Sequence, residues 1–142
     1  MAIREFQGPH RFLSNFYPAT VMYDGLVFRS VEHAYQAAKT DDWEVRKKIQ
    51  ALEKSGDAKK AGYRVPLRED WDRIKFGIME TLVRRKFEIP ELRNKLLMTG
   101  DQDLIEGNWW GDTFWGVCRG KGENHLGKIL MKIREEIRKE AP

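Results

Sequence analysis

Residues 30–39, S-V-E-H-A-Y-Q-A-A-K, constrain the fold more than any other stretch of the chain. Ser30 is a favourable N-cap, and the stretch after it has three alanines and neither glycine nor proline, which predicts a helix. Small side chains on one face of this helix let another element approach closely. We therefore expect it to be packed into the middle of a domain rather than to lie on the surface.

The polar residues of this predicted helix share a second face. At positions i, i+3, i+4 and i+7 they are Glu32, Tyr35, Gln36 and Lys39. A carboxylate on a buried helix is costly unless it is paired or used. Two interpretations of Glu32 therefore stay open: a structural carboxylate that pairs with a neighbouring loop, or a group that takes part in chemistry.

Composition limits the class of protein. A chain of 142 residues fits a single domain, residues 1–142, and its net charge of +4 favours anionic ligands such as phosphates or nucleic acid. No apolar run approaches the roughly 20 residues needed to span a bilayer, and the first residues lack the apolar core of a signal peptide. The single cysteine, Cys118, suits a reducing compartment, so we expect a cytoplasmic protein with no membrane partner. The three histidines lack metal-ligand spacing, so we expect no metal site, and we expect no cofactor.

The remaining patterns predict an α+β fold dominated by helices. Asp24-Gly25 between alternating apolar residues predicts a two-residue hairpin that leads directly into the helix after Ser30. Residues 3–6 predict a strand, Gly8-Pro9 a turn, and residues 104–106 another short strand. Further helices are expected over residues 42–55, 57–61 (a single turn), 71–87, 90–99 and from 124 on. The 71–87 helix is apolar over much of its girth and should be central. On the final helix, the side chains expected to face water are Lys132, Arg134, Glu135 and Lys139.

Two segments lack a regular period. In the first, Ser14 and Asn15 lie among aromatic residues, either as turn formers or as donors that point into a pocket. The second, residues 108–122, holds four aromatic residues, four glycines and one carboxylate, Asp112. A loop of this kind either lines a ligand site or closes the end of a core.

Five blocks of the sequence together resemble the YbiA/NADAR family, in the family's order and from about residue 3 to residue 138. They are F-L-S-N-F from Phe12, S-V-E-H-A-Y-Q-A-A-K from Ser30, W-x-x-x-K from Trp71, W-G-D-T-F-W-G from Trp110, and N-x-L-G-x-x-L-M from Asn124. The resemblance implies hydrolysis of N-glycosidic bonds. One branch of the family cleaves phosphorylated ribosylaminopyrimidine intermediates of riboflavin synthesis, and another removes ADP-ribose from guanine bases. After Gly62 the family often has Arg, whereas this chain has Tyr63 and then Arg64.

The residues of these blocks allow that chemistry. Cleavage of a ribosyl C–N bond passes through an oxocarbenium-like state, which one carboxylate can stabilise while a second activates water. Glu32 and Asp112 are the two carboxylates in non-surface contexts, and with Lys75 they form the predicted catalytic set. A tryptophan can stack on the base, and lysines can hold a phosphate, as can Gly120 and Gly122 ahead of a helix N-terminus. The predicted substrate-binding residues are Ser14, Asn15, Gln36, Lys39, Trp71, Trp110, Trp115, Lys121 and Asn124.

Two functions from different classes fit these residues. The first is an N-glycosidase acting on a phosphorylated ribosyl or ADP-ribosyl substrate, with ADP-ribosylated nucleic acid as a further partner class. The second is a module that binds ADP-ribose or NAD without turnover. Because a pure binder of an anion would be weakened by Glu32 and Asp112, we favour the enzyme. We expect one cleft to collect these two carboxylates, closer than roughly 15 Å, with Trp71 and Lys75.

Lys75 has two possible roles in such an enzyme. As an ammonium it would hold the phosphate, and as a neutral amine it would attack the anomeric carbon and form a Schiff base with the ring-opened sugar. We favour the electrostatic role, because neighbouring carboxylates hold a lysine in its protonated form.

Overall fold

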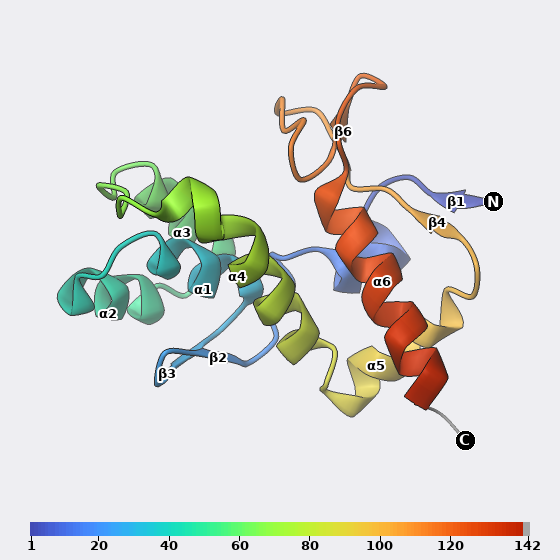
Figure 1. Ribbon diagram of the computed structural model, residues 1–142, viewed down its shortest axis with the longest axis horizontal. Coiled ribbons are helices and arrows are strands. Elements are labelled where there is room, and N and C mark those ends of the chain that lie inside the picture. The colour runs from blue at the N-terminus through green and yellow to red at the C-terminus, as the bar shows by residue number, and fades with distance from the viewer. Residues whose placement is uncertain (141–142) are drawn as a thin grey trace. The chain divides into compact units, whose positions relative to one another are not determined.

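The computed structural model of the protein describes residues 1–140, which form a mainly helical α+β fold with small sheets (Figure 1). This confirms the fold class expected from the sequence. The elements are β1 (Ala2–Ile3), the 3₁₀ helix η1 (Gly8–Leu13), β2 (Val21–Tyr23), β3 (Leu26–Phe28), α1 (Val31–Ala38), α2 (Trp43–Ala51), α3 (Ser55–Gly62), α4 (Trp71–Lys86), α5 (Pro90–Met98), β4 (Asp103–Leu104), β5 (Gly107–Asn108), β6 (Val117–Cys118) and α6 (His125–Glu140). They belong to two compact units, one of Asn15–Lys86 and one of Met1–Ser14 with the chain from Phe87 on.

The β2–β3 hairpin opens the unit of residues 15–86. Val21 pairs with Phe28 and Tyr23 with Leu26, so only two residues form the turn. Those residues, Asp24 and Gly25, both have positive φ, which is the backbone that such a turn requires and that Asp and Gly tolerate best. The predicted hairpin is confirmed.

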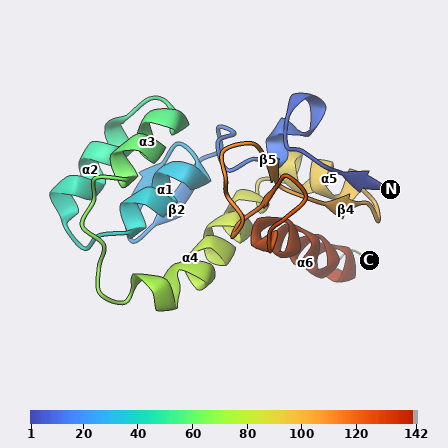
Figure 2. The ribbon, with the colours of Figure 1, turned by 90° about the horizontal axis from the view of Figure 1, so that it is seen from above.

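Helix α1 is the centre of this unit. The Ser30 hydroxyl accepts a hydrogen bond from the backbone N–H of His33, as the N-cap prediction requires, and all eight residues of the helix are buried. The alanines at positions 34, 37 and 38 let α2, α3 and α4 pack closely around it, together with the hairpin. Figure 2 shows α1 between α2, α3 and β2.

The region after α1 differs from the sequence prediction in its boundaries. Asp42 caps α2 with bonds from the N–H groups of Glu44 and Val45, but the helix ends at Ala51 instead of near Ser55. Ser55 begins α3, which is a full helix of eight residues rather than a single turn. Arg46 is buried and anchors α2 through bonds to Thr40 O (2.8 Å) and the Asp24 carboxylate (2.5 Å).

Helix α4 follows the predicted boundaries closely. Met79, Leu82 and Val83 are buried, but Phe76 is partly exposed. Less of the apolar surface of this helix is therefore buried than the sequence predicted. At its end Lys86 is 1% exposed, and burial lowers the pKa of its amine to about 7. The Lys86 ammonium also lies 5.8 Å from the centre of the Tyr17 ring, where a cation–π contact is favourable.

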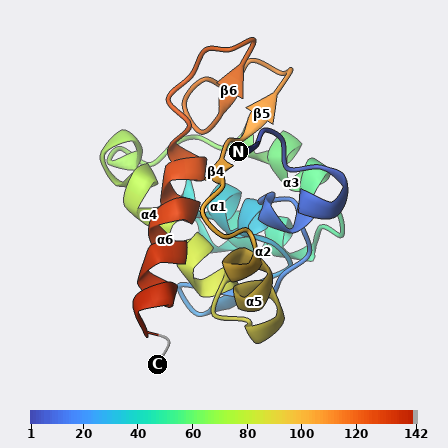
Figure 3. The same ribbon diagram turned by 90° about the vertical axis from the view of Figure 1, so that its right-hand side faces the viewer.

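The second unit pairs β1 with β4 and β5 with β6, each in parallel. Strand β1 is shorter and earlier than the predicted strand over residues 3–6, and Gly8-Pro9 begins η1 instead of a simple turn. Pro90 begins α5 and Thr99 caps its end, as predicted. Helix α6 packs on α5 and β4, as Figure 3 shows.

One prediction for α6 is wrong. Its apolar stripe is buried as expected, but Arg134 is only 6% exposed and does not face water. Its guanidinium donates a hydrogen bond of 2.8 Å to the hydroxyl of Thr99, the C-cap residue of α5. A long side chain with a partner at its end can be buried where its charge alone favours water. Among residues 1–140, no helix is long and apolar enough to cross a membrane.

Candidate active site

Glu32 lies on α1 at the second position of the helix and is 8% exposed. Its carboxylate accepts a hydrogen bond of 2.6 Å from Nε2 of Gln36, one turn later on the same face. Its backbone N–H donates to the carbonyl of Asn15, which ties the loop before the hairpin to the start of the helix. This hydrogen bond fixes the direction of the Glu32 carboxyl group on the polar face of α1.

Lys39 lies near the charge of Glu32 and near two further lysines. Burial lowers the pKa of the Lys39 amine, the charge of Glu32 raises it, and the charges of Lys59 and Lys75 lower it further. Lys39 and Lys75 were expected here, but Lys59 was missed. Lys59 comes from α3, and only the packing of α3 against α1 brings it to this face, so no local sequence pattern could have identified it. Together these ammonium groups can hold a phosphate.

Trp71, the first residue of α4, is 4% exposed and packs against Tyr35 of α1, with ring centroids 5.1 Å apart and planes tilted by 57°. Lys39 Nζ lies 5.7 Å from the centre of the Tyr35 ring. The aromatic pair therefore joins α4 to the polar face of α1. How much of Trp71 a substrate base contacts stays a prediction.

We expect Trp71→Phe to raise KM with little change in kcat, because a smaller ring keeps part of the contact with the base. Trp71→Ala should lower both kcat and affinity, and it should also lower Tm because it empties a buried site. The measurements are steady-state kinetics and thermal unfolding on the same preparations. Unchanged kinetic constants together with a loss of stability would place Trp71 in the core alone.

Ser14 and Asn15 lie at the junction between the units. The Ser14 N–H donates to Arg11 O at the end of η1, which supports the interpretation of Ser14 as a turn former. The Asn15 side chain donates to the sulfur of Met79 on α4 at 3.4 Å, within its own unit. This contact fixes the loop whose carbonyl holds the N–H of Glu32.

A hydrogen-bond network fixes the start of α1. His33 Nε2 lies 2.9 Å from Leu52 O, Nδ1 lies 2.7 Å from the Ser30 hydroxyl, and that hydroxyl accepts from Ser55 at 3.0 Å. Burial lowers the pKa of His33, the bond to Leu52 O raises it, and the charge of Arg29 lowers it again. Because a carbonyl can only accept, a neutral His33 carries its proton on Nε2 and takes the Ser30 proton at Nδ1.

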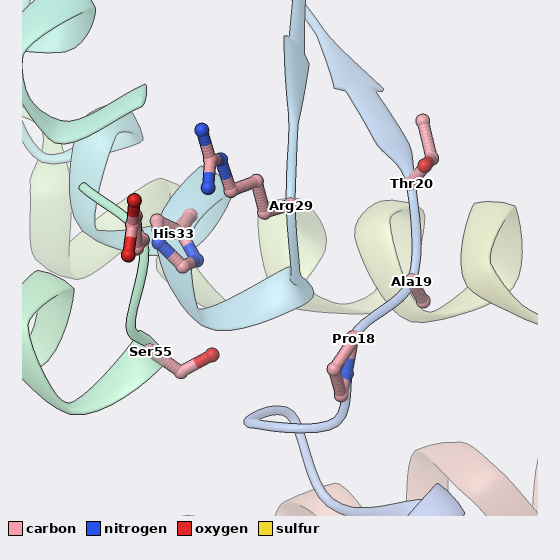
Figure 4. Close-up of a pocket in the computed structure, with 7 residues that line it drawn as sticks. Pro18, Ala19, Thr20, Arg29, His33 and Ser55 are labelled. Atoms are coloured by element: carbon pink, nitrogen blue, oxygen red, sulfur yellow. The ribbon is translucent and has the colours of Figure 1, made fainter. Parts of the chain in front are cut away.

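A pocket of about 460 Å³ lies beside this network (Figure 4). Its lining comes from the loop before β2, the residue after β3, α1, the loop between α2 and α3, and the start of α3: Pro18, Ala19, Thr20, Arg29, His33, Glu53 and Ser55. None of the predicted site residues is among them. The pocket is therefore separate from the face that carries Glu32, Gln36 and Lys39.

In the other unit, Asp112 organises the aromatic loop. Its Oδ1 accepts hydrogen bonds from the N–H groups of Phe114 (3.1 Å) and Trp115 (2.9 Å). The Asn108 side chain accepts a hydrogen bond from the backbone N–H of Asp112 and donates one to the backbone carbonyl of Asp112. It also donates to the Glu106 carboxylate at 2.9 Å. Within residues 1–140, no hydrogen bond is made by Oδ2 of Asp112, so the carboxylate is fixed in direction and keeps one oxygen available.

The backbone N–H groups at the start of α6 are bonded within the aromatic loop. The N–H groups of residues 123–126 donate to the carbonyls of Thr113, Gly116, Phe114 and Trp115, in that order, so the loop itself caps the helix. Lys121 is exposed and closes a tight turn with Cys118, whose corner is Arg119-Gly120. Both side-chain groups of Asn124 bond to backbone, at Leu104 and Glu106. These four N–H groups are therefore not available to a phosphate, and binding of one by Gly120, Lys121 and Gly122 stays a prediction.

The tryptophans of the loop differ in their surroundings. Trp110 is exposed and packs edge-to-face on Trp109, whereas Trp115 is half-buried against Phe114, with His125 of α6 beside them. Among residues 1–140, no group of three or more His, Cys, Asp or Glu side chains could hold a metal ion. Glu32 belongs to one unit and Asp112 to the other, and their sharing of one cleft stays a prediction.

Known proteins resemble the chain over most of its length. A family model described as the NADAR domain matches residues 3–138. An N-glycosidase of Nostoc punctiforme is 40% identical over 137 residues, which cover 92% of this chain and 87% of that protein. The N-glycosidase YbiA of Escherichia coli is 36% identical over 128 residues, which cover 87% of this chain and 79% of that protein. The NMR structure of E. coli YbiA matches with a TM-score of 0.85 at 33% identity, covering 99% of this chain and 85% of that one.

A riboflavin biosynthesis protein of Vibrio vulnificus is also 40% identical over 137 residues, but these cover 94% of this chain and 37% of that longer protein. The chain thus spans little more than a third of that relative. The fold and the relatives that match along most of their length define an N-glycosidase, an enzyme that hydrolyses N-glycosidic bonds. The chain belongs to the NADAR family, which confirms the resemblance found in its sequence blocks.

Proposed function

We propose that this N-glycosidase cleaves the bond between ribose and base in a phosphorylated ribosylaminopyrimidine of the kind formed in riboflavin synthesis. The observation that carries the proposal is the placement of Glu32, a buried carboxyl group held by Gln36. It lies near the charge of Lys39, which in turn lies near Lys59 and Lys75. This arrangement suits a ligand that develops positive charge at one end and carries a phosphate at the other. The Vibrio relative, named a riboflavin biosynthesis protein, favours this substrate over ADP-ribosylated guanine.

Glu32 and Asp112 divide the chemical work in this proposal. As the C–N bond breaks, its electron pair stays on the base nitrogen and positive charge develops at the anomeric carbon. The nitrogen takes up one proton, which balances the proton that the attacking water gives up. The sequence prediction assigns the stabilisation of this charge to the second carboxylate, Asp112. Glu32 takes a proton from the attacking water, whose oxygen bonds to the anomeric carbon.

The experiment that tests the function is a parallel incubation with the two substrates of the family. We expect release of ribose 5-phosphate from the ribosylaminopyrimidine phosphate, at a rate well above release of ADP-ribose from ADP-ribosylated guanine. The opposite preference would assign the enzyme to the second substrate. Tight binding of ADP-ribose with no product from either substrate would support a binding module instead.

Lys75 acts as an ammonium that holds the phosphate in this proposal, and its Nζ lies 3.5 Å from the Asp72 carboxylate. We therefore expect borohydride added during turnover to leave Lys75 unmodified, as judged by mass spectrometry of its peptide. The exposed Lys48 is the control for nonspecific modification. A sugar adduct on the wild type that is absent from Lys75→Ala would show that Lys75 forms a Schiff base.

A further inference from the structure

Gly62 is the last residue of α3 and lies where this helix packs against α1. A methyl group built on Gly62 would overlap the Oε1 atom of Gln36 and lie 2.5 Å from its Cδ and 3.2 Å from its Cγ. The φ angle of Gly62 is not positive, so any residue can adopt its backbone conformation. Space, rather than backbone conformation, is what requires glycine at this position.

The side chain that fills this space is the one that holds Glu32. Gln36 is 5% exposed, and its Nε2 donates to Glu32 at 2.6 Å. Because an ionised carboxylate can only accept hydrogen bonds, the amide nitrogen must face Glu32, and the oxygen therefore faces Gly62. That oxygen is buried and has no hydrogen-bond partner within residues 1–140.

A buried carbonyl without a partner is unfavourable, and the amide could relieve it only by turning away from Glu32. Its present orientation is therefore maintained by the bond to the carboxylate and by the free space over Gly62. A side chain at residue 62 would remove that space. The end of Gln36 would then have to move, and its bond to Glu32 would be lost.

We propose that Gly62 is a positioning residue for hydrolysis, because its missing side chain lets Gln36 keep its amide on Glu32 and so fixes the direction of that carboxylate. This inference rests on the proposed function in one respect, namely that Glu32 takes part in the chemical step. The inference gives α3 two roles: Lys59 of α3 helps to bind the phosphate of the substrate, and Gly62 of α3 sets the orientation of the Glu32 carboxylate at the anomeric carbon.

The contact is tested first by stability, without reference to activity. We expect Gly62→Ala to lower Tm by about 3–6 °C in the wild type, whereas in a Gln36→Ala background it should lower Tm by no more than about 1 °C. The matched control is Gly56→Ala in the same helix, where an added methyl group meets nothing within 4 Å and no loss should occur. Equal losses from Gly62→Ala in both backgrounds would overturn the contact with Gln36.

The positioning role is tested by kinetics on the same variants. Gly62→Ala and Gln36→Ala should each lower kcat about tenfold or more with KM little changed, the scale of a hydrogen bond to a charged group. The double variant should be no slower than Gln36→Ala alone, and Gly56→Ala should match the wild type. Either family substrate serves for this comparison, so a wrong choice of substrate leaves the test intact.

Each remaining outcome decides the proposal. Coupled losses of Tm with an unchanged kcat would confirm the contact but overturn the positioning role. If Gly62→Ala fails to fold, a folded double variant with the kcat of Gln36→Ala supports the proposal, because removing the Gln36 side chain removes the overlap. An unfolded double variant would show that Gly62 is needed for another reason and would overturn the proposal.

Discussion

Glu32→Gln should keep the fold and most of the affinity for ligand but lower kcat by about 100-fold or more, the scale of a lost acid/base group. The fold should survive because the new amide still offers an oxygen to Nε2 of Gln36 and adds no volume to a buried site. Turnover should fall because an amide cannot take a proton from water. The measurements are kcat with the accepted substrate, Kd for ribose 5-phosphate, and Tm.

The control for this variant is Glu44→Gln, which removes the same charge from an exposed position on α2. It should leave kcat, Kd and Tm close to the wild-type values. A folded Glu32→Gln protein with near-normal kcat would show that Glu32 is structural, which is the interpretation that the sequence left open.

Lys86→Met should change how stability depends on pH. In the folded protein the Lys86 pKa is about 7 against 10.5 for an exposed lysine, so above pH 7 the unfolded state binds more protons than the folded state. The free energy of unfolding of the wild type should therefore rise from about pH 7 toward pH 10.5, and the destabilisation from the charged amine should be fully present below pH 7. Lys86→Met lacks this contribution at every pH.

The measured quantity is the difference in unfolding free energy between Lys86→Met and the wild type. Between pH 7.5 and pH 9.5 this difference should shift in favour of the wild type by about 1.4 kcal/mol per pH unit, or about 3 kcal/mol in all, as pH rises. Taking the difference removes the contribution of other groups, such as Lys39, that titrate in both proteins. Lys48→Met, at an exposed site, should give no such slope. A constant difference across this range would mean that Lys86 keeps an ordinary pKa.

Local signals in the sequence predicted the elements that depend on neighbours in the chain. Asp24-Gly25 determines its turn through backbone preferences of two adjacent residues, and Ser30 caps α1 through a bond that spans three residues. Pro90 begins α5 for the same kind of reason. Such interactions act within one or two turns, so a pattern in the sequence contains all of their partners.

The features that the sequence did not reveal depend on partners far along the chain. Arg134 is buried because Thr99, 35 residues earlier, accepts its hydrogen bond. Lys59 reaches the site only through the packing of α3 on α1, and the N–H groups at the start of α6 are occupied because a loop ten residues earlier turns back over them. Charge and periodicity describe a residue and its helix, but they do not identify a partner at such a distance.

The sequence predicted the part of the candidate site that lies within a single helix. Glu32, Gln36 and Lys39 were grouped correctly on one face because helical spacing alone brings them together, and the bond between Glu32 and Gln36 follows from it. The direction in which the Gln36 amide points could not be foreseen, since it depends on Gly62, 26 positions later. Whether Asp112 acts on the same substrate stays a prediction.

The complete burial of α1 restricts how this enzyme can acquire a new substrate. Because all eight residues of α1 are buried, a larger side chain at any of its positions would displace a neighbouring residue. Drift and selection must therefore act on the elements that surround it, such as the exposed residues of α3 and the loop before α4. Directed evolution libraries placed there should yield active variants far more often than libraries placed on α1, so related enzymes with other substrates should share the helix and differ in its surroundings.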